Sequence, residues 1–166
     1  PAIAWLVSGK NPLQFLRAVS QPMVTALFTS SSAATLPLSM QTAQEKLGVD
    51  QARSAFVLPL GATANMDGTA LFEGIAAVFL AYMFGIDLGT TGVIAIFLVA
   101  MLSSVGAPGI PSGSMAGMQM VLLAVGIPLE AIGLLLLIER PLDTFRTAVN
   151  VEGDLVGCLV AKRFAS

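Results

Sequence analysis

A polar stretch, NMDGTALFEG at residues 65–74, interrupts an apolar segment that runs from Ala62 to Phe84. Asn, Asp and Gly favour local side-chain hydrogen bonds over helix continuation, so we expect a helix broken at Asn65-Met66-Asp67. A break frees backbone carbonyls beside two oxygen-bearing side chains, and hard cations such as Na⁺ prefer such ligands. The alternative interpretation is a kinked helix in which Asn65 and Asp67 only cap the break.

A second polar set lies on the last predicted helix, over residues 129–163. At about 100° per residue, its polar side chains share one face about 100° wide. An ionised side chain facing lipid costs roughly 3 kcal/mol, so this face, Asp67 and Glu73 are expected to meet one another or a wet cavity. A solvated amphipathic helix is the alternative, which the apolar AIGLLLLI before this face disfavours. The residues of the face are Asp143, Arg146, Thr147, Asn150, Asp154 and Gly157.

Composition restricts the class of protein. Of 166 residues 55% are hydrophobic and 11% charged, and the mean hydropathy is +0.85, which predicts a membrane protein. No cluster of Lys and Arg offers a face for nucleic acid. The chain has no His, and its one cysteine, Cys158, cannot form an internal disulfide and is expected to pack in the core. We therefore expect no enzyme activity and no cofactor.

Two pairs of short apolar segments predict re-entrant hairpins. The run Val93 to Leu102 covers only half of a roughly 30 Å hydrocarbon core. It meets SSVGAPGIPSGS, whose Gly and Pro cannot continue a helix, which predicts a hairpin over 90–126. The serine-rich TSSSAATLP predicts another over 12–46. Both tips offer backbone N–H groups that suit a carboxylate, and small-residue packing at a tight turn is the alternative.

Each predicted hairpin precedes a longer segment that holds an Asn and an Asp, a symmetry typical of transporters with inverted repeats. Lys and Arg flank the first hairpin and end the chain, whereas the connections at 85–92 and 126–131 have none, so the first hairpin is expected to enter from the cytoplasm. The expected fold is all-α, with two re-entrant hairpins and two transmembrane helices, over 53–84 and 129–163, in an inverted repeat. Because the chain starts at Pro1 without a signal peptide, we expect a fragment.

Four motifs, TSSSAATLP, LPLGATANMDGTALFEG, VGAPGIPSGS and DTFRTAVNVEGD, resemble in order and spacing the glutamate transporter family, the dicarboxylate/amino acid:cation symporters that include the excitatory amino acid transporters. The resemblance covers about Lys10 to Lys162. It implies the second half of a transport domain: hairpin 1 as inner gate, helix 7, hairpin 2 as outer gate and helix 8. It also implies a homotrimer in the full-length protein and an elevator mechanism.

The resemblance further implies a role for individual residues. Asp143 matches the aspartate that takes the substrate amino group, and Arg146 the arginine that takes its side-chain carboxylate. Glu73 lies where proton-coupled and potassium-coupled members carry glutamate and is a candidate for proton coupling, with a fixed hydrogen bond as the alternative. The implied substrate-binding set is Ser31, Ser32, Thr69, Gly109, Asp143, Arg146, Thr147 and Asn150. The implied Na⁺-binding set is Gly61, Thr63, Asn65, Asp67, Ser104, Asn150 and Asp154.

The chain departs from the family pattern at Ser30 and Thr144, where many members carry a second arginine; Arg140 lies near Arg146. An α-ammonium group needs a carboxylate, so Asp143 favours acidic amino acids over C4-dicarboxylates. We expect symport of glutamate or aspartate with Na⁺ or H⁺ across a bacterial inner membrane, with the lipid bilayer as surroundings and no nucleic acid. The alternatives are a C4-dicarboxylate symporter and a membrane module whose polar faces serve only helix association. For Arg146 alone, the alternative is that it only pairs with Asp143 or Glu139 to hold the helix face together.

Overall fold

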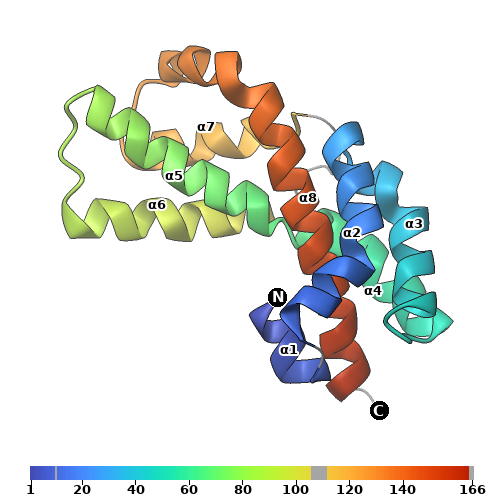
Figure 1. Ribbon diagram of the computed structural model, residues 1–166. Coiled ribbons are helices and arrows are strands. Elements are labelled where there is room, and N and C mark those ends of the chain that lie inside the picture. The colour runs from blue at the N-terminus through green and yellow to red at the C-terminus, as the bar shows by residue number, and fades with distance from the viewer. Residues whose placement is uncertain (10, 106–111, 165–166) are drawn as a thin grey trace.

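The computed structural model describes residues 1–9, 11–105 and 112–164, and every element in these ranges is helical (Figure 1). The predicted all-α fold is therefore confirmed for the described part of the chain. The elements are α1 Ala2–Ser8, α2 Pro12–Thr29, α3 Ser32–Glu45, α4 Gln51–Ala64, α5 Asp67–Met83, α6 Gly89–Ser104, α7 Met115–Ala124, the 3₁₀ turn η1 Leu129–Ala131, and α8 Ile132–Phe164.

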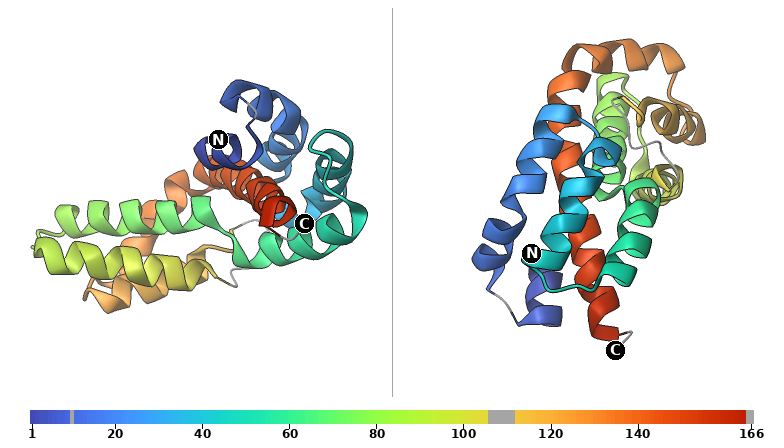
Figure 2. Two further views of the ribbon diagram at one scale, coloured as in Figure 1. Left: turned by 90° about the horizontal axis from the view of Figure 1, so that it is seen from below. Right: turned by 90° about the vertical axis from the view of Figure 1, so that its right-hand side faces the viewer.

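Helix α8 connects the two halves of the molecule. Its 33 residues span about 50 Å at a rise of about 1.5 Å per residue. Helices α1 to α4 pack around its C-terminal half, while α5 and α6 run side by side away from that bundle, with α7 beside them (Figures 1 and 2). The middle of α8 therefore lies where the two halves meet.

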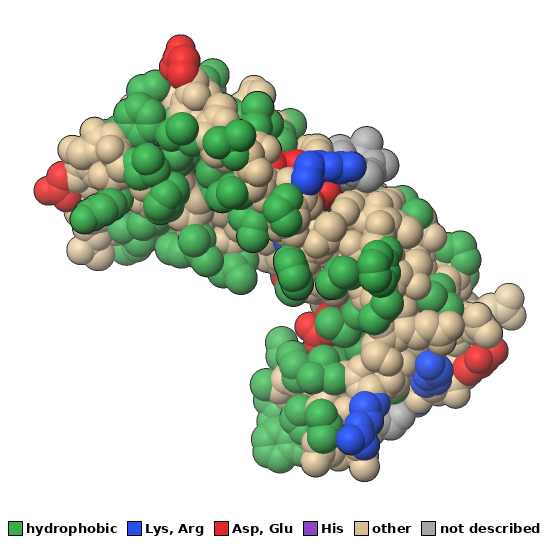
Figure 3. All heavy atoms as spheres, turned by 45° about the horizontal axis from the view of Figure 1, so that its top comes forward, with side chains coloured by type: hydrophobic (Ala, Val, Ile, Leu, Met, Phe, Trp, Pro, Cys, Tyr) green, Lys and Arg blue, Asp and Glu red, His purple; other side chains and the backbone are tan. Residues whose placement is uncertain are grey.

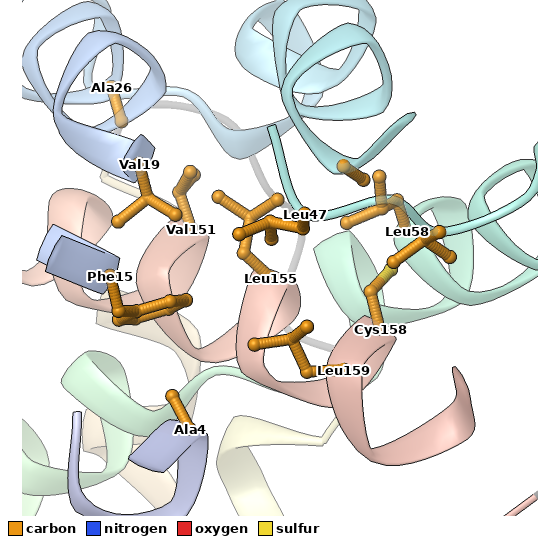
Figure 4. Close-up of a cluster of buried hydrophobic side chains, with 12 residues drawn as sticks. Ala4, Phe15, Val19, Ala26, Leu47, Leu58, Val151, Leu155, Cys158 and Leu159 are labelled. Carbon is orange, nitrogen blue, oxygen red and sulfur yellow. The ribbon is translucent and has the colours of Figure 1, made fainter. Parts of the chain in front are cut away.

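Each half has its own apolar core. In the first, Phe15 and Val19 of α2 point toward Val151, Leu155 and Leu159 of α8 (Figure 4). Cys158 is fully buried in this cluster, which confirms its predicted packing role. The second core combines residues of α5, α6 and α7 with the start of α8: Ala77, Leu80, Ile96, Met118, Leu122 and Leu135. The middle of α8 lies between the two apolar cores, and its polar side chains are found there.

Local capping explains where the first helices begin and end. Asn11 accepts a hydrogen bond from the Leu13 N–H (2.9 Å), with Pro12 in the first turn of α2. Helix α2 ends at Thr29, and the next residue, Ser30, has a left-handed φ of 49°. The Ser31 hydroxyl then accepts a hydrogen bond from the Ala34 N–H (3.1 Å) and caps the start of α3. The serine-rich stretch therefore stops one helix and caps the next.

Asp50 caps the start of α4 in the same way. Its carboxylate accepts the Arg53 N–H (2.9 Å), and this bond holds the pKa of Asp50 below its ordinary value. The Asp50 cap in the short turn after α3 therefore sets the start of α4, which continues to Ala64.

The predicted break in the following helix is confirmed. Helix α4 ends at Ala64 and α5 begins at Asp67, and Asn65 (ψ 71°) and Met66 (ψ 58°) lie between them in non-helical conformations. Within the described ranges, one stretch, Gln51–Met83, is long and apolar enough to cross a membrane, while α6 and α7 are shorter apolar helices. The hairpins over 12–46 and 90–126 correspond to the pairs α2–α3 and α6–α7; that they re-enter a membrane, and that they form an inverted repeat, stay predictions.

Large apolar side chains cover the outside of the second half. Figure 3 shows hydrophobic side chains over much of the α5–α7 region, whereas most Lys and Arg side chains seen on that face lie over the other half. Phe79 and Leu98 are about half exposed, and Tyr82 is 85% exposed. A groove of about 440 Å³ between α5 and α8 is likewise lined by apolar residues such as Phe72, Ile75, and Leu142. Surfaces of this kind suit lipid or further protein rather than water.

Candidate functional site

The polar face of α8 is buried. Five side chains of the predicted face and the neighbouring Glu139 are each at most 5% exposed, although these six include three carboxylates and a guanidinium. A solvated amphipathic helix would expose these groups, so that alternative is wrong. Burial of ionisable groups at this density requires mutual pairing or a ligand. The six are Glu139, Asp143, Arg146, Thr147, Asn150 and Asp154.

Arg146 is held on three sides. Its Nε donates to Asp143 Oδ1 (2.9 Å), and its Nη2 lies 2.6 Å from Glu139 Oε1 and 2.8 Å from Asp143 Oδ1. The Phe72 ring of α5 covers one face of the guanidinium, at 4.4 Å from Cζ to the ring centroid. Nη1 is buried and has no hydrogen-bond partner among the described residues. One end of the guanidinium is therefore open to an acceptor.

Asp143 keeps contacts on both oxygens. Its Oδ2 accepts the Ser112 N–H from the chain just before α7 (3.0 Å). Arg140 Nη1 lies 3.9 Å from the same oxygen, but the Arg140 side chain is 67% exposed. Its charge is thus screened by solvent and adds little to the site. The Thr147 hydroxyl donates within α8 to the Asp143 backbone carbonyl (2.7 Å). This bond fixes the Thr147 side chain on the polar face of α8.

Asn150 joins α8 to the start of α5. Its Oδ1 accepts the N–H groups of Gly68 (2.7 Å) and Thr69 (3.3 Å), and its Nδ2 donates to Thr69 Oγ1 (3.2 Å) and to Met66 Sδ (3.2 Å). Because no side chain within α5 caps its first turn, Asn150 supplies this cap from another helix. A Cβ on Gly68 would contact the Arg146 backbone oxygen, so only glycine permits this approach of α5 to α8.

The predicted cation ligands gather at the break. Asn65 Nδ2 donates to Asp154 Oδ1 (3.1 Å), and a Cβ on Gly61 would lie 2.5 Å from that same oxygen. A Cβ on Gly153 would lie 2.5 Å from Asp67 Oδ2, which places Asp67 against α8 as well. No trio of Cys, Asp and Glu side chains in the described residues could hold a metal ion. The structure thus brings two carboxylates and an amide together at the break, and their part in Na⁺ binding stays a prediction.

Two members of the predicted cation set bond within their own helices. The exposed Thr63 hydroxyl donates to the Leu60 carbonyl (3.0 Å), and the buried Ser104 hydroxyl donates to the Met101 carbonyl (3.0 Å). Their part in ion binding stays a prediction. Gly109, predicted to line the substrate site, lies outside the described residues.

The serine-rich tip between α2 and α3 is buried. Ser31 and Ser32 are 7% and 3% exposed, at the point where α2 and α3 meet. The Ser32 hydroxyl has no hydrogen-bond partner in the part of the chain that the structure describes. A buried hydroxyl without a partner is costly, so Ser32 is available to a ligand.

Glu73 is fully buried between α5, α6 and α7. The Ser103 hydroxyl of α6 donates to its Oε2, and a Cβ on Gly117 of α7 would contact its Oε1. That second oxygen has no hydrogen-bond partner among the described residues. The fixed hydrogen bond considered from the sequence is therefore present, and the role of Glu73 in proton coupling stays a prediction.

The sequence indicates Glu139, one turn before Asp143 on the same face of α8, as a possible partner of Arg146, and the structure contains that ion pair. Sequence reasoning missed Phe72, which covers the guanidinium, and Ser112, which donates to Asp143 and Glu139. Phe72 and Ser112 come from other elements, and nothing in the local sequence indicates that they reach α8.

Comparison with known proteins shows the family of this chain. A family model described as the sodium:dicarboxylate symporter family matches residues 1–164. Excitatory amino acid transporter 2 of Homo sapiens is 47% identical over 157 residues, which cover 95% of the chain and 27% of that protein. The excitatory amino acid transporter of Caenorhabditis elegans is 42% identical over 165 residues (99% and 33%), and excitatory amino acid transporter 3 of Mus musculus is 44% identical over 165 residues (99% and 32%).

The chain spans between 27% and 33% of the length of these curated relatives. The matches cover nearly all of the chain, including the break, the serine-rich tip and the polar face of α8. The chain belongs to the sodium:dicarboxylate symporter family, whose members are membrane-embedded secondary transporters and not enzymes.

Proposed function

We propose that these residues carry the substrate and cation sites of a symporter that moves an acidic amino acid, glutamate or aspartate, together with Na⁺. The observation that carries the proposal is the buried pair Asp143 and Arg146, whose open Nη1 has no partner among the described residues. An acidic amino acid has an ammonium group for Asp143 and a side-chain carboxylate for Arg146. The relatives are named excitatory amino acid transporters, which agrees with this class of substrate.

The same pair disfavours a C4-dicarboxylate, although the family description names dicarboxylates. A dicarboxylate would bring two negative charges to a site that already holds Glu139 and Asp143 against one buried guanidinium. An amino acid adds a positive group beside Asp143, which offsets that repulsion. The remaining alternative, a module that serves only helix association, gives the open Nη1 and the unpartnered Ser32 hydroxyl no role.

The cation would bind at the break between α4 and α5. Asp67, Asp154 and Asn65 lie there against one another and against α8, and two nearby carboxylates repel each other until a cation neutralises them. Asn150 touches both regions, since it caps α5 and lies one turn from Asp154 and one from Arg146. Cation binding at the break would thereby order the first turn of α5, which carries Thr69. Proton coupling through Glu73 is the alternative to Na⁺.

The remaining parts of the proposal concern the whole protein. The pairs α2–α3 and α6–α7 would be the two re-entrant hairpins and would form, with the helices over 53–84 and 129–163, an inverted repeat that moves by an elevator mechanism. The exposed apolar side chains of α5 and α6 support contact with lipid or with further protein, as in a longer, homotrimeric transporter. The relatives named above come from animals, so a bacterial inner membrane as the location stays a prediction.

Binding measurements on the full-length protein test the proposal. Aspartate, succinate and serine are titrated calorimetrically in Na⁺ and in choline, with wild type, Asp143→Asn and the exposed control Asp87→Asn. We expect Na⁺-dependent aspartate binding that Asp143→Asn weakens and Asp87→Asn leaves unchanged. Tighter binding of succinate than of aspartate would identify a dicarboxylate carrier instead. Absence of cation-dependent binding of all three compounds would support the helix-association module.

A further inference from the structure

Arg146 is held by two carboxylates, of which only Asp143 has a part in the proposed recognition. The second, Glu139, is 3% exposed and lies 2.6 Å from Arg146 Nη2 through its Oε1. Its Oε2 accepts a hydrogen bond from the Ser112 hydroxyl (3.1 Å). Burying a second carboxylate at this point is costly, and the proposed function gives it no contact with an amino acid substrate.

We propose that Glu139 determines the selectivity between acidic and neutral amino acids, because it competes with the substrate's side-chain carboxylate for Arg146. This inference rests on the proposed function, since it names a further residue of the same site.

The geometry of the guanidinium carries the argument. A carboxylate binds a guanidinium most strongly through two parallel hydrogen bonds, which need two neighbouring N–H groups. Nε and Nη2 already donate to Asp143 and Glu139, and Phe72 covers one face of the group. Only Nη1 has no hydrogen-bond partner among the described residues. A substrate carboxylate must therefore bind at Nη1 alone, beside the charge of Glu139, or displace Glu139 from Nη2.

Both routes weaken an acidic substrate and spare a neutral one. Serine or alanine presents no side-chain carboxylate, so it meets no repulsion from Glu139. Glu139 also keeps Arg146 paired when such a substrate is bound, which avoids an unpaired buried guanidinium. Glu139 thus occupies the place of the missing side-chain carboxylate when the site is empty or holds a neutral amino acid.

Ser112 fixes Glu139 in this competing position. Its hydroxyl bonds Glu139 Oε2 and its N–H bonds Asp143 Oδ2 (3.0 Å), with a left-handed φ of 62° that is uncommon for serine. Removing the hydroxyl leaves both charges in place but frees Glu139 to withdraw. Ser112→Ala should therefore act in the same direction as neutralising Glu139, by a smaller factor.

The test is equilibrium binding of aspartate and serine to the full-length protein at saturating Na⁺, for wild type, Glu139→Gln, Ser112→Ala and the exposed control Glu130→Gln. Glu139→Gln keeps the shape and a hydrogen-bond acceptor but removes the charge. We expect the ratio of aspartate affinity to serine affinity to rise about tenfold in Glu139→Gln, the size of one charge-assisted hydrogen bond, and to stay at the wild-type value in Glu130→Gln.

If Glu139 only held the helix face together, its replacement would change the aspartate and serine affinities equally. An unchanged or lower ratio in Glu139→Gln would therefore overturn this inference and leave the proposed function intact. If that variant does not fold, Ser112→Ala decides, and a ratio that does not rise contradicts the competition. Wild-type protein that binds neither amino acid would overturn the proposed function and this inference with it.

Discussion

Replacing Gly153 by Ala is expected to weaken Na⁺ binding while leaving α8 folded. The new Cβ would lie 2.5 Å from Asp67 Oδ2 and 2.9 Å from Asn65 Nδ2, closer than real Cβ atoms approach such groups. Both are the ends of rotatable side chains, so they can swing away instead of disrupting the helix. Restoring an ordinary contact of 3.4 Å moves the Asp67 oxygen by about 1 Å.

The displacement sets the size of the effect. A carboxylate oxygen that moves from about 2.4 to about 3.4 Å from a monovalent cation loses about 2 kcal/mol at an effective dielectric constant of about 20. Because Asp67 is exposed and solvent screens part of this loss, Na⁺ affinity should fall by up to about 30-fold. The helix itself gains about 0.5 to 1 kcal/mol from the replacement of glycine by alanine, which partly offsets the crowding.

Gly157 provides a matched control one turn later on α8. A Cβ there would have only Val57 Cγ1 nearby, at 3.9 Å, so the same substitution has room. The assay is the Na⁺ concentration that half-saturates aspartate binding to the full-length protein, with thermal unfolding as a check on folding. We expect a rise of that concentration in Gly153→Ala and none in Gly157→Ala. Equal Na⁺ dependence in the two variants would refute the placement of the cation site.

Three further substitutions test other parts of the account. Arg146→Cys should weaken aspartate about tenfold to hundredfold relative to serine in competition binding, and a wild-type affinity ratio would show that Arg146 does not bind the side-chain carboxylate. Glu73→Gln should abolish the pH dependence of uptake measured in proteoliposomes; an unaltered pH profile would remove the proton role. Leu155→Ala, at a fully buried position, should lower the free energy of unfolding by about 2 to 5 kcal/mol, whereas Phe164→Ala, at a position 79% exposed, should change it little. Similar melting temperatures for these last two variants would contradict the assignment of the first core.

Features set by local chemistry could be predicted from the sequence. The break at Asn65 and Met66 follows from residues that disfavour helix, and the polar face of α8 follows from the helical repeat. The serine-rich tip was likewise predictable, because Ser31 serves as a helix cap. Each of these depends on neighbours within one or two helical turns.

Contacts between distant segments could not be predicted. Asn150 caps a helix that begins more than eighty residues earlier, and Ser103 bonds Glu73 from a neighbouring helix. Phe72 of α5 covers the Arg146 guanidinium of α8, although 74 positions separate the two residues in the sequence. Such pairings are properties of the assembled fold, and only their residue types are visible in the sequence.

The central claim is that the site around Asp143 and Arg146 binds an acidic amino acid and that Na⁺ drives its transport. The most direct measurement is uptake of labelled aspartate into proteoliposomes that contain the full-length protein, with an inward Na⁺ gradient and with choline in its place. The account predicts accumulation that requires the Na⁺ gradient and that unlabelled glutamate inhibits more strongly than succinate. Uptake that succinate inhibits more strongly than glutamate, or that proceeds equally in choline, would contradict it.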